Sequence, residues 1–268
     1  ESNNNIEITV PSASLSAGTG AVLTLDATSS GVTAVGHATF AAGTGIIVTD
    51  SIAGSGGGTL VFNAVRSSYT SGGQLTLKTG KSITTAGGDM EITAFDLDLE
   101  SSSTVSAGGG AVTVHGAKLD QTIGIGATSG NMHVDGDELQ RITSTGGLAF
   151  GSSVSGSVTV NAVTATHSAN LGTVSLLATQ STGSANTVTF TGAACTFTGL
   201  AVQAHNLVVG VGVHAGSTLV EIQGSTTGET IGLGATPHQL ELSVDELERI
   251  TTTGGLSLGS ATSGSMTV

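Results

Sequence analysis

The sequence has almost no large aromatic side chains. Its 268 residues include no Trp, one Tyr and six Phe. Sandwich cores usually need large aromatics to fill the space between two sheets, so we expect a narrow core of small and β-branched side chains instead. The apolar fraction of 38% excludes a disordered Gly/Ser linker, because such linkers lack the apolar surface that folding requires.

Basic residues are also scarce. Six Lys and Arg stand against nineteen Asp and Glu, which gives a formal net charge of −13. We therefore expect no nucleic-acid partner, because nucleic-acid binding is driven by Lys and Arg that neutralise phosphates. For the same reason we do not expect an anionic membrane surface as a partner. The acidity favours solubility and attracts divalent cations.

Cysteine and long apolar runs are missing as well. Cys195 is the one cysteine, which excludes an internal disulfide framework. It is expected to be a small buried apolar side chain, with a covalent link to another chain as the alternative. No apolar run reaches the roughly 18 residues that a spanning helix needs, so we expect no membrane insertion.

A block of the chain occurs twice, 108 positions apart and without a gap. Residues 122–160 and 230–268 are identical at 23 of 39 aligned positions. An internal period of this kind is typical of a repeat architecture. A weaker match extends upstream, where AFDL at 94–97 aligns with AHNL at 204–207 at an offset of 110.

Short apolar–small–apolar triplets recur along the chain, separated by Gly, Ser, Thr and Asn. Examples are 97–99, 112–114, 148–150 and 256–258. Alternation with a period of two predicts half-buried strands. The spacing also fits an antiparallel sandwich or barrel, but the long repeat and the lack of aromatics favour stacked parallel strands.

The predicted fold is therefore all-β, a right-handed parallel β-helix (β-solenoid) with short loop or helical-turn decorations. Right-handed crossovers are the rule for parallel connections. At the turn lengths of known solenoids, the chain would make about twelve turns and 108 residues about five. We expect residues 1–268 to be one continuous solenoid segment of a longer protein, because SGSVTV at 155–160 runs on where SGSMTV ends the sequence.

One segment breaks the strand pattern in each copy. DELQRIT and DELERIT are each followed closely by two glycines. The i, i+4 spacing of Asp and Arg supports one exposed helical turn with a charge pair, and the glycines allow the chain to re-enter the stack with positive φ. The positions expected to be structural are Asp137, Arg141, Gly146, Gly147, Asp245, Arg249, Gly254 and Gly255.

The repeated block, with residues 155–179 after its first copy, resembles the repeats of large surface proteins of the filamentous-haemagglutinin and autotransporter-adhesin type. The resemblance implies a β-helical stalk, fibre or adhesin that is extracellular or displayed at the cell surface. It carries over no catalytic residues. The calcium-binding nonapeptide found in some secreted repeat proteins does not occur in the sequence.

Acidic residues are the main candidates for chemistry. Asp96, Asp98 and Glu100 alternate, so they share one strand face. Hard cations need several oxygen ligands, and a Ca²⁺ site is one interpretation. The other is a solvated outer face with Leu97 and Leu99 turned inward, because alternate carboxylates lie about 7 Å apart.

A second acidic group and the histidines carry weaker signals. Asp135, Asp137 and Glu138 correspond to Ser243, Asp245 and Glu246, and a glycan-cleaving acid/base pair would need carboxyls at a defined separation. A surface pair of Asp137 with Arg141 is the plainer interpretation. The seven His residues are scattered without metal-ligand spacing, and we expect them to be incidental surface groups.

These observations favour a structural component of an extracellular fibre over an enzyme. Its expected partners are copies of itself or further repeats of the same chain, joined end to end, and it needs no cofactor. The alternative is an adhesin that binds glycans through one flank. A carbohydrate-active enzyme on the same fold is the third hypothesis.

Overall fold

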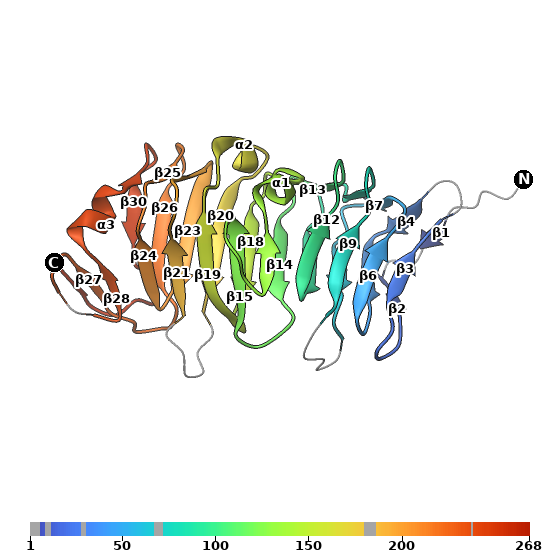
Figure 1. The fold of residues 1–268 in the computed structure, drawn as a ribbon, viewed down its shortest axis with the longest axis horizontal. Coiled ribbons are helices and arrows are strands. Elements are labelled where there is room, and N and C mark those ends of the chain that lie inside the picture. The colour runs from blue at the N-terminus through green and yellow to red at the C-terminus, as the bar shows by residue number, and fades with distance from the viewer. Residues whose placement is uncertain (1–5, 9–11, 28–30, 67–71, 180–185, 237) are drawn as a thin grey trace, which may run out of the picture.

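The computed structural model describes residues 6–8, 12–27, 31–66, 72–179, 186–236 and 238–268. In this part of the chain every strand pair is parallel. The strands stack into a rod with the two termini at opposite ends (Figure 1). The fold is all-β with long parallel sheets, as the triplets and the repeat predicted.

The longest sheet, here called the long face, has ten strands stacked one after another along the length of the rod (Figure 1). In spatial order they are β2 (Ser12–Ser16), β5 (His37–Ala41), β8 (Leu60–Asn63), β11 (Met90–Ala94), β14 (Val112–Gly116), β18 (Leu148–Ser152), β20 (Thr173–Ala178), β23 (Gly199–Ala204), β26 (Val220–Gly224) and β30 (Leu256–Leu258).

The second face precedes the long face in each turn and consists of two sheets. The first contains β1 (Ile6–Ile8), β4 (Val32–Val35), β7 (Ile52–Ser55), β10 (Ser82–Thr84), β13 (Thr104–Gly108) and β17 (Ile142–Ser144). The other contains β22 (Cys195–Phe197), β25 (Val213–Ala215) and β29 (Ile250–Thr251).

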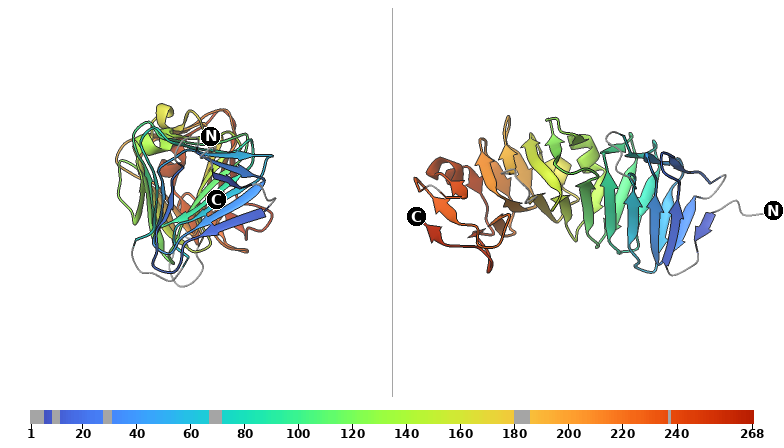
Figure 2. Two further views of the ribbon diagram at one scale, coloured as in Figure 1. Left: turned by 90° about the vertical axis from the view of Figure 1, so that its right-hand side faces the viewer. Right: turned by 90° about the horizontal axis from the view of Figure 1, so that it is seen from below.

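The third face follows the long face in each turn and consists of three sheets. In spatial order these are β3 (Leu23–Leu25), β6 (Gly45–Val48), β9 (Gln74–Leu77) and β12 (Asp96–Leu99); then β16 (Met132–Val134), β15 (Gln121–Gly126), β19 (Ser155–Asn161), β21 (Thr187–Phe190) and β24 (Asn206–Val209); then β28 (Leu240–Leu242), β27 (Ile231–Leu233) and β31 (Met266–Thr267). Viewed along the rod, the strands form the sides of a closed cross-section (Figure 2).

Two strands of the third face lie out of chain order. β16 follows β15 in the sequence but lies on its N-terminal side, next to β12, where the His133 N–H donates to Asp96 Oδ1 at 2.9 Å. β28 stands in the same relation to β27. We call β16 and β28 the wedge strands, because each is inserted between two successive turns.

Each wedge strand leads into a short helix at the corner of the rod. These are α1 (Gly136–Gln140) and α3 (Val244–Glu248), so the helical turn predicted from the DELxRIT segments is confirmed. A third helix, α2 (Ala165–Ser168), follows β19 and packs beside α1. Among the described residues, no helix has the length and apolar character needed to span a membrane.

The sequence period corresponds to a whole number of steps along the long face. Starting from β18, the ladder passes in register through Phe150, Leu176, Val202, Ile222 and Leu258. Positions 150 and 258 are 108 residues apart, so the period spans four turns. The expected five turns are therefore wrong, because each wedge strand and its helix lengthen one turn per period without adding a step to the ladder.

The core is a single apolar column of small and branched side chains. Phe40 and Phe62 are fully buried and stack in adjacent turns with ring centroids 5.1 Å apart. Every predicted triplet named above lies in a strand. The outer two residues are buried at 97–99, 112–114 and 148–150, whereas in the last turn Leu256 is exposed and Leu258 is half-buried. Parallel, in-register strands place like residues above one another, which allows such a narrow core to pack without voids.

The two glycine pairs after the helices perform two tasks. Gly147 and Gly255 have φ of 116° and 95°, so the predicted positive φ is confirmed for the second glycine of each pair. The first glycine permits a close approach. A Cβ on Gly146 would lie 2.6 Å from Gly109 O, and one on Gly254 would lie 2.2 Å from Thr218 O.

The repeat provides a matched test of what a following turn contributes to stability. Leu148 is 1% exposed beneath β20, whereas its counterpart Leu256 in the last turn is 39% exposed. We expect Leu148→Ala to lower the free energy of unfolding by about 2–5 kcal/mol and Leu256→Ala to lower it by less than half as much. Urea unfolding followed by circular dichroism measures both, and equal losses would contradict the assigned burial.

Candidate functional site

The most organised polar site is a clamp at the first wedge strand. Glu138 and Arg141, from α1 and its end, both bind the backbone of Leu99, the last residue of β12. Leu99 N–H donates to Glu138 Oε1 at 3.0 Å, and Arg141 Nη1 donates to Leu99 O at 2.8 Å. One carboxylate and one guanidinium thus satisfy both backbone polar groups of a single residue where the ladder is interrupted by the wedge.

The same clamp recurs at the second wedge strand. Val209 ends β24, and its N–H donates to Glu246 Oε1 at 3.1 Å. Arg249 Nη1 donates to Val209 O at 3.0 Å. The clamp residues are 108 positions apart and the clamped residues 110 apart, which is the offset of the AFDL and AHNL match.

Local chemistry fixes the helix that carries each clamp. The N-cap side chains of Asp135 and Ser243 accept hydrogen bonds from the backbone N–H groups of Glu138 and Glu246, respectively. In return, each Glu carboxylate accepts a hydrogen bond from the backbone N–H of its N-cap residue. Such a capping box satisfies two backbone donors at once. Each Glu therefore closes its helix with one oxygen and binds the neighbouring turn with the other.

Glu138 lies in an unusual electrostatic environment. Burial, reinforced by the nearby carboxylates of Asp135 and Asp96, raises its pKa to about 7 against the opposing effect of the two N–H donors. Burial also raises the pKa of Asp96. The Glu138 carboxyl therefore holds its proton more strongly than an exposed glutamate does, and its N–H bonds offset the loss of hydration.

The predicted pair of Asp137 with Arg141 does not form. Asp137 is exposed, and none of the ion pairs among the described residues includes it or Arg141. The same holds for Asp245 and Arg249. The guanidinium points to the carbonyl of the clamped strand, because a buried carbonyl without a partner is costly and an exposed ion pair gains little.

The acidic strip splits into separate contacts. Asp96, Asp98 and Glu100 share an outer face above buried Leu97 and Leu99, as predicted. Asp96 binds the wedge strand, whereas the Lys78 ammonium at 2.5 Å, with Thr79, holds the pKa of Glu100 at about 2. Among the described residues no group of three or more His, Cys, Asp or Glu is placed to hold a metal ion.

A buried polar position distinguishes the two copies. Gln121 Nε2 donates to Phe95 O at 2.7 Å, and its Oε1 accepts from Ala117 N–H at 3.1 Å. The counterpart of Gln121 is Glu229, which is 1% exposed and has no N–H to donate. His205, at the counterpart position of Phe95, brings Nδ1 to 2.9 Å from Glu229 Oε1. This proximity does not have the geometry of a hydrogen bond, and Glu229 Oε1 is left as a buried acceptor without a hydrogen-bond donor.

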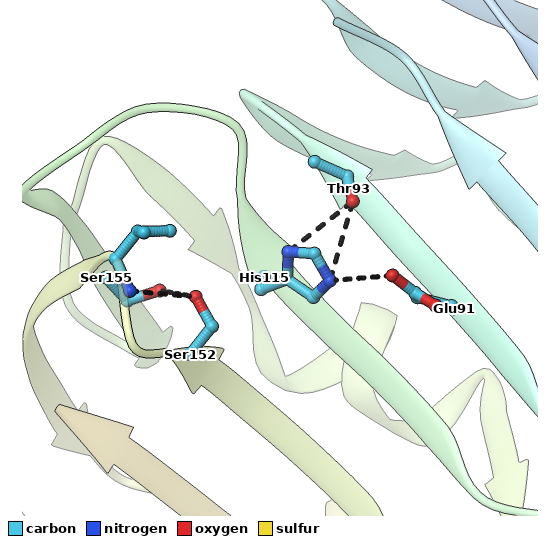
Figure 3. A network of polar contacts seen from close by, with 6 residues as sticks. Glu91, Thr93, His115, Ser152 and Ser155 are labelled. Atoms are coloured by element: carbon cyan, nitrogen blue, oxygen red, sulfur yellow. Dashed lines mark hydrogen bonds and ion pairs between the residues drawn. The ribbon is translucent and has the colours of Figure 1, made fainter. Parts of the chain in front are cut away.

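Most other histidines have a backbone or surface partner. His115 lies on the long face, where its ring contacts Glu91 at 3.3 Å and Thr93 at 3.4 Å (Figure 3). The nearby hydroxyls of Ser152 and Ser155 form a hydrogen bond with each other and not with His115. His133 and His167 line an open hollow of about 410 Å³ beside α1. His133 Nε2 contacts Gly126 O, and His167 Nδ1 accepts from Thr164 N–H.

Cys195 is fully buried in β22, and burial raises the pKa of its thiol. The prediction of a small buried apolar side chain is confirmed. A covalent link to another chain would require this turn to open.

Comparison with protein-family models, with curated proteins and with solved structures finds no match to this chain. The function must therefore be argued from the residues themselves.

Sequence reasoning missed Glu138, Glu246, His205 and Glu229 as organising groups. The signal for the first two was readable, because D-x-x-E and S-x-x-E before a short helix form a capping box, and both Glu residues recur at the 108-residue period. The signal for the other two was the simultaneous change of Gln121 to Glu229 and of Phe95 to His205 between the copies.

Arg141→Ala tests the clamp directly. We expect it to lower the free energy of unfolding by about 1–3 kcal/mol, because Leu99 O loses its charged donor in a half-buried site. Asp137→Ala is the matched control and should change it by under about 0.5 kcal/mol. Chemical unfolding of both variants measures the difference. A loss of unfolding free energy in Asp137→Ala as large as that in Arg141→Ala would support the surface ion pair of Asp137 with Arg141 and contradict the clamp.

The raised pKa of Glu138 predicts a pH dependence of stability. A carboxyl with a folded-state pKa near 7 and an unfolded value near 4.5 binds its proton more tightly in the folded state. Stability is therefore lost as pH rises from about 4.5 to 7, by at most about 3 kcal/mol. The difference between the wild type and Glu138→Gln should shrink or change sign over this range.

Urea midpoints measured from pH 5 to pH 8 test this expectation. Glu246→Gln is the control, because it makes the same replacement of one acceptor oxygen by an amide NH2 in the second clamp. A difference between wild type and Glu138→Gln that stays constant over this range would contradict the assignment.

Proposed function

We propose that this chain is a segment of an extracellular or cell-surface fibre or stalk, and that its work is mechanical. The observation that carries the proposal is the ladder of the long face, in which ten strands pair in one continuous parallel order from Ser12 to Leu258. Tension along the rod is shared among backbone hydrogen bonds in successive turns, and stability grows as a sum of turn and neighbour contributions.

The distribution of groups between the two copies supports a structural role. The clamp residues Glu138 and Arg141 recur in the second copy with the same backbone contacts. Two other candidate reactive groups do not recur, since Asp135 is replaced by Ser243 and His133 by Glu241. A repeated element selected for holding turns together fits a fibre better than an active site.

Finer features belong to the same proposal. We include right-handed winding in the proposal, because parallel crossovers favour it. The proposed length was about twelve turns, and the long face has ten strands, one for each turn. The partners would be further repeats of the same chain or other copies of it. The resemblance to repetitive surface adhesins in the sequence supports the location outside the cell.

Electron microscopy of the native protein tests the proposal. We expect thin unbranched filaments or stalks, because stacked turns extend along one axis only. Compact particles of uniform size would overturn it. Saturable glycan binding by such particles would favour the adhesin, and polysaccharide turnover lost on changing one acidic residue would favour the enzyme.

A further inference from the structure

A hollow of about 350 Å³ opens on the third face, in the N-terminal half of the rod. It lies over β6 and β9 (Figure 1). Small-molecule sites are typically hollows of roughly 300–1,000 Å³ that combine apolar walls with a few polar groups, and this hollow has both. The side chains that line it are Val22, Thr44, Ile47, Gln74, Thr76 and Phe95.

Two glycines in the lining keep the hollow open. Gly45 and Gly73 have φ of 145° and 95°, and residues with a side chain rarely adopt such angles. A Cβ on Gly73 would also lie 2.1 Å from Val65 Cγ2. The backbone conformation therefore prevents side chains at these two positions from filling this part of the third face.

The least exposed side chain of the lining carries a hydroxyl without a hydrogen bond. Thr76 points outward from β9, since Leu75 and Leu77 on either side are fully buried, yet only 8% of it is exposed. Within the part of the chain that the structure describes, its Oγ1 has no hydrogen-bond partner, whereas Thr85, which is equally buried, donates to Gly88 O. A buried hydroxyl without a partner is costly, so Thr76 is placed to bind a ligand that enters the hollow.

Phe95 supplies an aromatic wall. It is half-buried, whereas every other aromatic side chain that the structure describes is buried. Phe95 lies at the corner between β11 and β12, where its N–H donates to Gly73 O at 3.0 Å and its carbonyl accepts from Gln121 Nε2 at 2.7 Å. These backbone bonds fix the position of the residue beside the hollow, and its ring offers an apolar face to the C–H groups of a ligand.

The charges around the hollow select for a neutral ligand. None of the lining side chains is ionisable, so no ion pair can form within the hollow. Asp96 and Asp98 on the next strand lie in register with Gln74 and Thr76, and they repel an anion at a strand spacing of about 4.8 Å. A ligand with an apolar C–H face and several hydroxyl groups matches the aromatic wall and the uncharged polar groups together. Neutral sugar units have both properties.

We propose that the hollow over β6 and β9 is a binding site for a neutral saccharide unit of a glycan. The hydroxyls of Thr44 and Thr76 and the amide of Gln74 hydrogen-bond with the hydroxyl groups of the sugar, and Phe95 contacts its C–H face. Binding is non-covalent and leaves the sugar unchanged. The inference goes beyond the proposed fibre function and does not depend on it, because the hollow occupies one flank of the rod and not the ladder of the long face.

The aromatic wall does not recur in the second copy of the repeat. The counterpart of Phe95 is His205, and its Nδ1 lies 2.9 Å from the buried carboxylate of Glu229. A polar ring held beside a carboxylate does not offer the same apolar face. We therefore expect one saccharide site in the 268-residue chain and not one site per repeat.

Thr76→Val separates binding from stability. Valine keeps the branched shape and removes only the hydroxyl, which has no hydrogen bond within the protein. We therefore expect the urea midpoint to stay the same or to rise, while the affinity for a neutral oligosaccharide falls roughly 3- to 10-fold. Phe95→Ala should weaken binding by about 10-fold or more, because it removes the apolar wall. Thr189→Val makes the same change as Thr76→Val on β21, elsewhere on the third face, and is the matched control.

The probe is a panel of immobilised neutral oligosaccharides built from hexoses and N-acetylhexosamines, with sulfated and carboxylated chains as an anionic arm. Wild type and Thr189→Val should bind at least one neutral member saturably, and isothermal titration with that oligosaccharide should give one site per chain. The site is overturned if no neutral member binds, if only the anionic arm binds, or if Thr76→Val and Phe95→Ala bind as tightly as wild type.

Failure of this site is distinguishable from failure of the proposed function. Filaments in the electron microscope that bind no neutral oligosaccharide would overturn the site and leave the fibre standing. Compact particles that bind one, and lose it in Thr76→Val, would overturn the fibre and leave the site standing.

Discussion

Every part of this structure depends on the parallel backbone ladder between successive turns. Parallel pairing in register places like positions of neighbouring turns above one another, such as Phe40 on Phe62. That constraint keeps the core narrow and explains why a chain with no Trp and one Tyr can bury its apolar residues. It also means that each interruption of the ladder leaves backbone groups that some side chain must satisfy.

The clamps are where that requirement is met by charged groups. At Leu99 and at Val209 a carboxylate binds the N–H and a guanidinium binds the carbonyl. Glu138 tolerates partial desolvation because its two oxygens have assigned donors. Since the clamp carries charge at a sheet break, it specifies where the wedge strand must lie, which apolar packing alone does not do.

The fold could be predicted from the sequence because its signals were local and repeated. Triplets such as 112–114 gave the strands, and the 108-residue offset indicated a stack. The number of turns per period could not be derived, because nothing local marks β16 as a strand that steps backward beside β12. Arg141 was assigned the wrong partner for a related reason. Helical spacing brings Asp137 within reach, whereas the backbone that Arg141 binds lies 42 residues earlier in the chain.

The wedge strands also determine the shape of the axis. The four-, five- and three-stranded sheets of the third face together hold two strands more than the ten-stranded long face. At about 4.8 Å per strand, the third face is longer by about 10 Å. Because the third face is longer than the long face, we expect the rod axis to curve toward the long face. Because the wedge recurs once in every four turns, tandem copies would add their bends in a regular way and form an arc or a coil of constant curvature.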